Sequence, residues 1–272
     1  MSGAKVVVDR RYRGYILDVD GVLVRGGEAI PGAGDALRRL REDADVVLLT
    51  NNSTRTRDAL ARNLAALGLD VAPAKIVTSA VLAARWLAER EGICRVAVLG
   101  EEGLVEELSF AGHEVVALGA PAGWVVAGMD RSATYDRLAG AAASLRSGAR
   151  LLATNDDATY PTPDGPVPGA GAMIGALRGI GYRPEAILGK PNVAAFEAAL
   201  CVLGISPNEV VVVGDRLETD IAGARNAGLD SILVQTGIAR KVPQTGLRPT
   251  WSAHDISAVA DGALLAVGKG AR

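Results

Sequence analysis

Short runs of β-branched residues alternate along this chain with longer segments, rich in Ala, Leu and Arg, that have helical periodicity. The runs at 15–19 (YILDV) and 45–50 (DVVLLT) read as buried strands, whereas 56–68 reads as a helix with leucines spaced by four and three residues. Such alternation is typical of βαβ units, which build a mostly parallel sheet covered by helices. The pattern therefore predicts an α/β fold.

A second set of strands and helices interrupts the first. It begins near residue 80 and ends with the strand-like run RLLAT at 150–154, which a loop rich in Pro, Gly and Asp follows at 155–171. The alternation of the first set of strands and helices then resumes with EAILG at 185–189. We therefore expect a discontinuous core, residues 1–80 plus 184–272, with an inserted α/β domain at 81–183.

The composition argues against a nucleic-acid-binding protein and against a membrane protein. The net charge is −2 and basic residues are interspersed with acidic ones, so no basic stripe is available for a nucleic-acid backbone. No apolar run approaches the roughly 18 to 20 residues needed to cross a bilayer, and the N-terminal residues lack the apolar stretch of a signal peptide. We expect a cytoplasmic protein with neither nucleic acid nor a membrane as a partner.

Cysteine and histidine are scarce in this chain. It has two cysteines, Cys94 and Cys201, and two histidines, His113 and His254. This excludes a His-rich metal centre, and no cysteine has a histidine near it in sequence to suggest a nucleophilic pair. We expect both cysteines to be small buried thiols in a reducing compartment.

Polar residues follow three of the predicted strands at their carboxyl ends, where ligands gather in an open parallel sheet. A carboxylate at the end of a buried apolar strand is costly unless something neutralises it, and converging acids repel one another. Oxygen ligands without histidine or thiolate indicate Mg²⁺. The residues concerned are Asp18 and Asp20 after the first strand, Thr50, Asn51 and Asn52 after the second, and Asp215 and Asp220 after a later one.

The spacing of these residues suggests phosphoryl transfer. Asp18 and Asp20 are two residues apart, so on a strand both would face the same way, and one can attack while the other donates a proton. Gly21 permits a sharp turn that brings backbone N–H groups close to an anion. Thr50 and Asn51 offer a hydroxyl and an amide to phosphoryl oxygens. Attack by a carboxylate on phosphorus would form an aspartyl-phosphate.

Phosphoryl transfer also requires positive charge around the equatorial oxygens of the transition state. Lys190, in ILGKPN, follows a short predicted strand and precedes a predicted helix. A lysine there can contact both the phosphoryl group and the carboxylate of Asp18. The alternative is an ordinary surface lysine at a helix start.

Four segments, in chain order, resemble the four motifs of haloacid dehalogenase (HAD) superfamily phosphatases: DVDGV, LLTNNS, GKP and VVGDRLETDI. The insertion between the second and third motifs, together with LLATNDDATYPTPDG, resembles the NagD-type, para-nitrophenylphosphatase-like branch with a type 2 cap domain. The likeness covers residues 14–240. It implies a Rossmann-like HAD core that carries an inserted α/β cap.

The resemblance also assigns roles to individual residues. Asp18 would be the nucleophile, Asp20 the general acid/base, and Lys190 the cation that orients the phosphoryl group, which the second motif at 50–52 would help to bind. It implies a homodimer through the cap as well. The implied Mg²⁺ ligands are the carboxylates of Asp18 and Asp215 and the backbone carbonyl of Asp20, with Asp220 supporting them through water or hydrogen bonds.

The loop after the last cap strand reaches the active site in this family, which makes Asn155 and Asp157 candidate substrate-binding residues. Asp156 stands between them where the family usually has proline. Two adjacent acids would add negative charge and disfavour strongly anionic substrates. The alternative is a turn in which Asn and Asp side chains cap backbone groups.

We therefore predict a Mg²⁺-dependent phosphatase that acts on a small phosphorylated metabolite through an aspartyl-phosphate on Asp18. A dehalogenase would have no use for the acid at Asp20, because a halide leaves without a proton. A phosphomutase or phosphotransferase on the same fold and a non-enzymatic phospho-receiver domain remain as alternatives. Mutases of this superfamily usually carry a helical cap after the first motif, and 22–44 is too short for one, whereas a receiver would not explain the insertion. The identity of the phosphate ester stays open.

Overall fold

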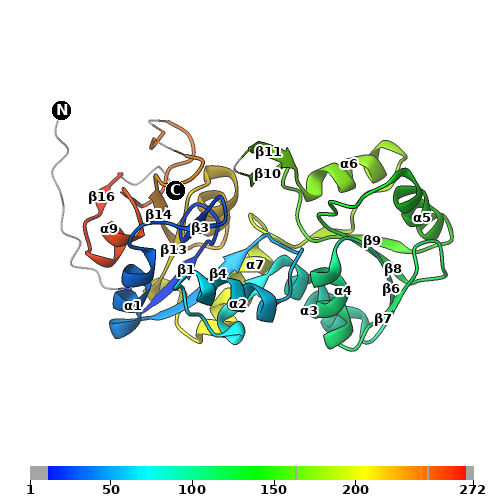
Figure 1. Cartoon of the computed structure of the whole chain (residues 1–272), viewed down its shortest axis with the longest axis horizontal. Coiled ribbons are helices and arrows are strands. Elements are labelled where there is room, and N and C mark those ends of the chain that lie inside the picture. Colours follow the sequence, from blue (N-terminus) through cyan, green and yellow to red (C-terminus); the bar gives the residue numbers. More distant parts are fainter. Residues whose placement is uncertain (1–11, 163, 240, 244, 268–272) are drawn as a thin grey trace. The chain divides into compact units, whose positions relative to one another are not determined.

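The computed structural model of the chain describes residues 12–162, 164–239, 241–243 and 245–267, and they divide into two units (Figure 1). The first unit takes in the described residues up to Thr50, then Ala61–Val77 and those from Lys190 onward. The second takes in Asn51–Leu60 and Thr78–Gly189, so the expected insertion, 81–183, lies within it. Of the expected core range, residues 1–11, 240, 244 and 268–272 lie outside the described residues.

A seven-stranded sheet organises the first unit (Figure 1). The strands from β4 through β1, β13 and β14 to β15 run parallel, and β16 joins antiparallel. In spatial order the strands are β16 (Leu265–Ala266), β15 (Trp251–Ala253), β14 (Asp230–Val234), β13 (Val210–Gly214), β1 (Gly14–Leu17), β4 (Asp45–Thr50) and β5 (Ile76–Thr78).

Helices and turns connect these strands. In α1 (Ala33–Asp43), Ala33, Ala36, Leu37 and Leu40 are buried along one face, with Asp35 in the first turn and Arg41 in the last. The other connecting elements are the hairpin of β2 (Val24–Arg25) and β3 (Glu28–Ala29), the helices α2 (Arg57–Ala66), α7 (Val193–Leu203), α8 (Ala222–Asn226) and α9 (Ile256–Ala260), the 3₁₀ turns η1 (Pro73–Lys75) and η2 (Pro207–Glu209), and the π-turn η3 (Leu217–Ile221).

A five-stranded parallel sheet organises the second unit. In spatial order its strands are β12 (Ala186–Ile187), β9 (Arg150–Ala153), β8 (Trp124–Ala127), β6 (Arg95–Leu99) and β7 (Glu114–Val116). Its helices are α3 (Ser79–Glu91), α4 (Glu102–Phe110), α5 (Tyr135–Arg146) and α6 (Ala170–Gly179).

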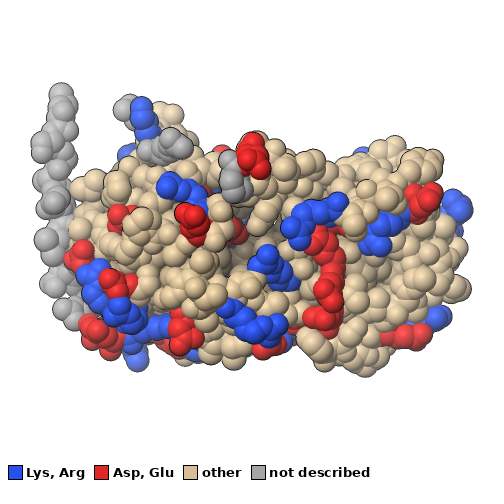
Figure 2. All heavy atoms as spheres, in the orientation of Figure 1, with Lys and Arg blue, Asp and Glu red and all other residues tan. Residues whose placement is uncertain are grey.

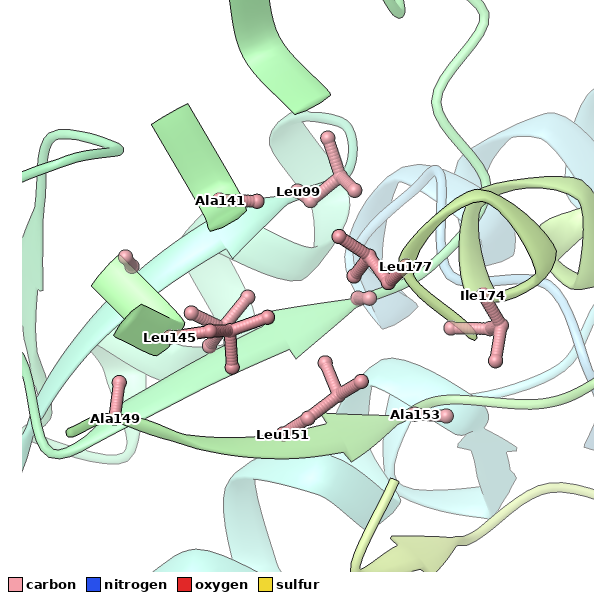
Figure 3. Close-up of a cluster of buried hydrophobic side chains, with 11 residues drawn as sticks. Leu99, Ala141, Leu145, Ala149, Leu151, Ala153, Ile174 and Leu177 are labelled. Carbon is pink, nitrogen blue, oxygen red and sulfur yellow. The ribbon is translucent and has the colours of Figure 1, made fainter. Parts of the chain in front are cut away.

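The apolar core of the second unit lies between this sheet and helices α5 and α6. Figure 3 shows Leu145 of α5 and Leu177 of α6 in one cluster with Leu99 and Leu151 of the strands. Each of these leucines is almost fully buried, and burying such a side chain contributes about 1.5–3 kcal/mol. The second unit therefore has a hydrophobic core of its own.

The α/β class predicted from the alternation is confirmed, but one segment differs. The stretch 155–171, expected to be a loop, contains an antiparallel hairpin of β10 (Thr159–Thr162) and β11 (Gly165–Pro168). Pro161 pairs with Pro166 in that hairpin. Proline cannot donate to a ladder, so the run does not read as a strand, yet a two-stranded hairpin leaves half of its N–H groups facing outward.

The surface agrees with the charge pattern of the sequence. On the face shown in Figure 2, basic and acidic side chains are interspersed. Within the described part of the chain, no helix combines the length and apolar character needed to span a bilayer. The cytoplasmic location stays a prediction.

The close approach of α4 to the segment at 51–60 leads to a test of packing. A Cβ added at Gly103 would lie 2.3–2.4 Å from backbone atoms of Arg55. We expect Gly103→Ala to destabilise the protein by about 2–3 kcal/mol, because backbone yields less readily than a side chain. Gly175→Ala in α6 is the matched control, since nothing lies within 4 Å of its added Cβ, and it should be neutral or stabilise by up to about 1 kcal/mol. Urea unfolding measures both, and equal stabilities would contradict the packing argument.

Candidate active site

Three neighbouring strands of the first unit end together. β1 pairs in parallel with β4 on one side and with β13 on the other, so their carboxyl ends lie at one edge of the sheet. The pairing continues one residue past β1, where the N–H of Asp18 donates to the carbonyl of Val213 at 2.9 Å. Thr50 is the last residue of β4 and is buried, and Asp215 directly follows β13.

Three buried carboxylates meet at this edge. One oxygen each of Asp18, Asp215 and Asp220 lies within 4.8 Å of the other two. Asp20 lies close enough for its charge to raise the pKa of Asp18, and its backbone forms a bridge with Val24. The sequence prediction that these acids converge therefore describes the structure correctly.

Lys190 lies among the carboxylates. Its ammonium is 2.8 Å from Oδ1 of Asp18 and 2.6 Å from Oδ1 of Asp220, and the residue is only 4% exposed. Burial by itself would lower the pKa of Lys190, but the two carboxylates raise it above its usual value, so the ammonium stays charged. The alternative of a surface lysine at a helix start is wrong.

Asp18 is held in place by two donors. Its Oδ1 accepts from the N–H of Val19 at 2.7 Å as well as from Lys190. Burial raises the pKa of Asp18 well above its usual range, and although Lys190 opposes this shift, the charges of Asp220 and Asp215 add to it. A further positive charge beside this group would favour its ionised form.

Asp215 provides the observation that bears most directly on cation binding. Its Oδ2 accepts from the N–H of Ile238 at 2.6 Å, whereas its buried Oδ1 has no hydrogen-bond partner. Burial and the charge of Asp220 raise the pKa of Asp215 to about 6. An unpartnered buried acceptor costs about 1–3 kcal/mol, more for a charged group. A divalent cation with a preference for oxygen ligands fits this group of residues.

Asp220 is placed by the π-turn η3, a rare backbone form that is frequent at functional sites. Its Oδ1 accepts from Lys190 and its Oδ2 from the N–H of Arg216 at 3.1 Å. Both oxygens are therefore engaged, which suits a residue that holds Lys190. Glu218, left out of the predicted metal ligands, is exposed.

Gly21 makes the sharp turn that the sequence predicts. Its φ is 85°, and its N–H donates to the carbonyl of Val24 at 2.7 Å. The turn itself therefore uses this donor, and contact of neighbouring backbone N–H groups with an anion stays a prediction. A Cβ at this position would lie 2.5 Å from the carboxylate of Asp215, so glycine also makes room for that carboxylate.

The remaining predicted residues belong to the second unit. Nδ2 of Asn51 donates to Asp157 at 3.0 Å, and Nδ2 of Asn155 donates to the carbonyl of Asn51 at 2.8 Å. Oδ1 of Asn52 accepts from both the N–H and the hydroxyl of Thr54. These contacts join Asn51, Asn155 and Asp157 to one another, whereas Asn52 bonds to Thr54. The roles of these residues toward substrate stay predictions.

Asp156 forms a salt bridge with Arg178. Both of its carboxylate oxygens accept from Nη1 of Arg178, at 3.1 and 2.8 Å. The neighbouring backbone follows the turn alternative, since the N–H of Asp157 donates to Oδ1 of Asn155 at 3.1 Å. The salt bridge weakens the argument that Asp156 repels anionic substrates, and its effect on specificity stays a prediction.

Folding does bring one cysteine beside a histidine. Sγ of Cys94 lies 3.5 Å from Nδ1 of His113, whose Nε2 lies 3.0 Å from the carbonyl of Ala84. An N–H on Nε2 fits that carbonyl, which leaves Nδ1 as an acceptor for the backbone and thiol of Cys94. Burial and Glu91 raise the pKa of the Cys94 thiol, so this pair is not an activated nucleophile. The prediction of buried thiols is wrong for Cys201, which is exposed, and Cys94 is only half-buried.

Sequence reasoning missed the loop after β14, where Thr236, Gly237 and Ile238 adjoin the site. The hydroxyl of Thr236 donates to the carbonyl of Gly21 at 2.6 Å, and Ile238 binds Asp215. A signal was present, because QTG follows a buried strand just as the other motifs do. Backbone donors carry no residue-type signature, which is why that loop did not stand out.

The chain matches known protein families and structures. A family model described as haloacid dehalogenase-like hydrolase matches residues 15–114, and one described as HAD-hydrolase-like matches residues 187–259. The 5′-nucleotidase YutF of Bacillus subtilis is 35% identical over 243 residues, which cover 87% of this chain and 92% of that protein.

Solved structures of phosphatases also align with this chain over most of its length. The p-nitrophenyl phosphatase from Archaeoglobus fulgidus aligns with a TM-score of 0.86 and 33% identity, covering 92% of this chain and 99% of its own. The glycerol phosphate phosphatase from Mycobacterium tuberculosis, in complex with calcium, aligns with a TM-score of 0.83 and 34% identity, covering 91% of this chain and 74% of its own.

These similarities extend over most of the chain and include both sequence and fold. They confirm the resemblance inferred from the four motifs and the predicted class of enzyme. The chain belongs to the haloacid dehalogenase-like hydrolases, as a NagD-type, para-nitrophenylphosphatase-like phosphatase that hydrolyses phosphoric monoesters.

Proposed function

We propose that this phosphatase is Mg²⁺-dependent and hydrolyses a small phosphorylated metabolite through an aspartyl-phosphate on Asp18. The observation that carries the proposal is the buried, unpartnered Oδ1 of Asp215, which lies in a group of three carboxylates beside the ammonium of Lys190. Such a group has an excess of negative charge and only oxygen ligands.

The proposed ligands of Mg²⁺ are the carboxylates of Asp18 and Asp215 and the backbone carbonyl of Asp20. Asp220 supports them by holding Lys190, since both of its oxygens already accept hydrogen bonds. When bound, Mg²⁺ would supply positive charge to the phosphoryl oxygens. The relative from Mycobacterium tuberculosis binds calcium, another divalent cation with a preference for oxygen ligands.

Asp18 is the proposed nucleophile. Its Oδ1 is fixed by Val19 and Lys190, and its Oδ2 would attack phosphorus. The bond from phosphorus to the leaving oxygen breaks as the bond to Asp18 forms. Lys190, charged and buried, would stabilise the negative charge that develops on the phosphoryl oxygens.

Asp20 is the proposed acid and base. As a carboxylic acid it donates its proton to the leaving alkoxide, and as a carboxylate it then accepts a proton from water. That water attacks phosphorus and releases phosphate from Asp18. The enzyme returns to its starting protonation state.

The substrate is proposed only as a class. The relatives named above are a 5′-nucleotidase, a p-nitrophenyl phosphatase and a glycerol phosphate phosphatase, so their names do not agree on one ester. Substrate contacts of Asn155 and Asp157, and a homodimer through the second unit, stay predictions.

Removal of divalent metal tests the cofactor. Excess chelator should reduce release of phosphate from para-nitrophenyl phosphate to background, because the carboxylates alone repel an anionic substrate, and added Mg²⁺ should restore it. Full activity in chelator would contradict the proposal for Mg²⁺. The same assay separates a phosphatase from a phospho-receiver domain.

Removal of the attacking carboxylate tests the nucleophile. Asp18→Asn should lower kcat by at least about a thousandfold, because the covalent step is lost. Circular dichroism should show an unchanged fold. Activity within tenfold of the parent enzyme would mean that another group attacks phosphorus.

Substrates with different leaving groups test Asp20. Asp20→Asn should slow esters of alkyl alcohols at least about tenfold more than aryl esters such as para-nitrophenyl phosphate, because a poor leaving group needs the proton more. The measurement is the ratio of kcat/KM for the two substrate types. Equal losses on both would contradict the acid role.

A further inference from the structure

The loop that follows β14 encloses the carboxylate of Asp215. We propose that Thr236, Gly237 and Ile238 are positioning residues that fix Asp215 with Oδ1 available to the cation, an inference that rests on the proposed function. In that scheme these residues touch neither substrate nor reacting atoms, and they act through Asp215 and the turn at Gly21 that packs against it.

Consecutive backbone donors hold Asp215 at two points. The N–H of Ile238 donates to Oδ2 at 2.6 Å, and the N–H of Ala239 donates to the backbone carbonyl of Asp215 at 3.0 Å. The side chain is therefore fixed relative to its own backbone. With Oδ2 occupied, Oδ1 is the oxygen left without a hydrogen-bond partner.

Gly237 makes this close approach possible. A Cβ built there would lie 1.8 Å from Oδ2 of Asp215 and 2.5 Å from its Cγ. Its backbone lies outside the left-handed region, because Gly237 is not among the glycines with positive φ. Alanine is therefore compatible with the backbone, and its methyl group would meet the carboxylate of Asp215.

Thr236 connects this loop to the turn after β1. Its hydroxyl donates to the carbonyl of Gly21 at 2.6 Å, and its own carbonyl accepts from Nη1 of Arg25 at 3.1 Å. Gly21 in turn packs against Asp215, where an added Cβ would lie 2.5 Å from the carboxylate. Two loops thus enclose Asp215, and Thr236 holds them together.

This arrangement resembles the outer contacts that orient metal ligands in general. Hydrogen-bond partners behind a ligating group typically change metal affinity by about 10–100-fold when they are removed. A merely structural role would lower stability without a selective effect on cation binding. Metal affinity therefore distinguishes the two roles.

Isothermal titration calorimetry of the metal-free full chain with Mg²⁺ tests the inference. Gly237→Ala should weaken Mg²⁺ binding by about 10–100-fold. Thr236→Val should weaken it by about tenfold, and Thr236→Ser, which keeps the hydroxyl, should bind within about threefold of the parent protein. Gly175→Ala is the matched control for the added methyl group and should bind Mg²⁺ like the parent.

Activity supplies a second readout. Raising the Mg²⁺ concentration should recover most of the kcat of Gly237→Ala, because the variant lacks affinity and not a reacting group. Mg²⁺ affinity of Gly237→Ala within about threefold of the parent would overturn the inference while leaving the proposed function intact. If that variant does not fold, Thr236→Val against Thr236→Ser decides, and equal affinities of these two would overturn it. A parent protein that hydrolyses the ester in chelator and does not bind Mg²⁺ would overturn the proposed cofactor as well.

Discussion

The ion pairs of Lys190 with Asp18 and Asp220 are the interaction on which the site depends. An ammonium is costly to bury, and only close contact with carboxylates compensates for the loss of water. Here one lysine contacts two of the three clustered carboxylates, at 2.8 and 2.6 Å. Asp215 is the third, so one buried ammonium lies among three carboxylates. Burial, with repulsion between the carboxylates added to it, raises the pKa values of Asp18 and Asp215.

Close backbone packing lets so many acids share one sheet edge. Gly21 and Gly237 both lie where any side chain would overlap the carboxylate of Asp215, and a Cβ at Gly214 would lie 2.2 Å from Cβ of Asp220. Backbone N–H groups can then donate to the carboxylates, as Val19 does to Asp18 and Ile238 does to Asp215. These donors partly offset the negative charge, as backbone N–H groups do in anion-binding loops. The glycines of this site therefore serve the electrostatics as well as the turns.

The polar residues of the second unit differ from the clustered acids, because they pair with one another. Asn51, Asn155 and Asp157 bond to one another, and Asp156 pairs with Arg178, so these groups are engaged within the unit. The apolar core of α5, α6 and the sheet supports that unit by itself (Figure 3). The stability of the second unit can therefore vary separately from the site in the first unit.

The sequence by itself determined the alternation of strands and helices, the acids at the strand ends, and the motif order that identifies Asp18 and Lys190, because periodicity and motif order are local or linear properties. Only the tertiary structure decided which oxygen of Asp215 is left without a partner, that Asp220 holds Lys190, and that the N–H of Gly21 is used by its own turn. The loop at 236–238 and the proline-containing hairpin β10–β11 likewise emerged only in space. These features depend on atoms brought together from distant positions, such as Thr236 and Gly21, which are 215 residues apart. They also depend on backbone groups, which every residue type shares and which therefore leave no mark in the sequence.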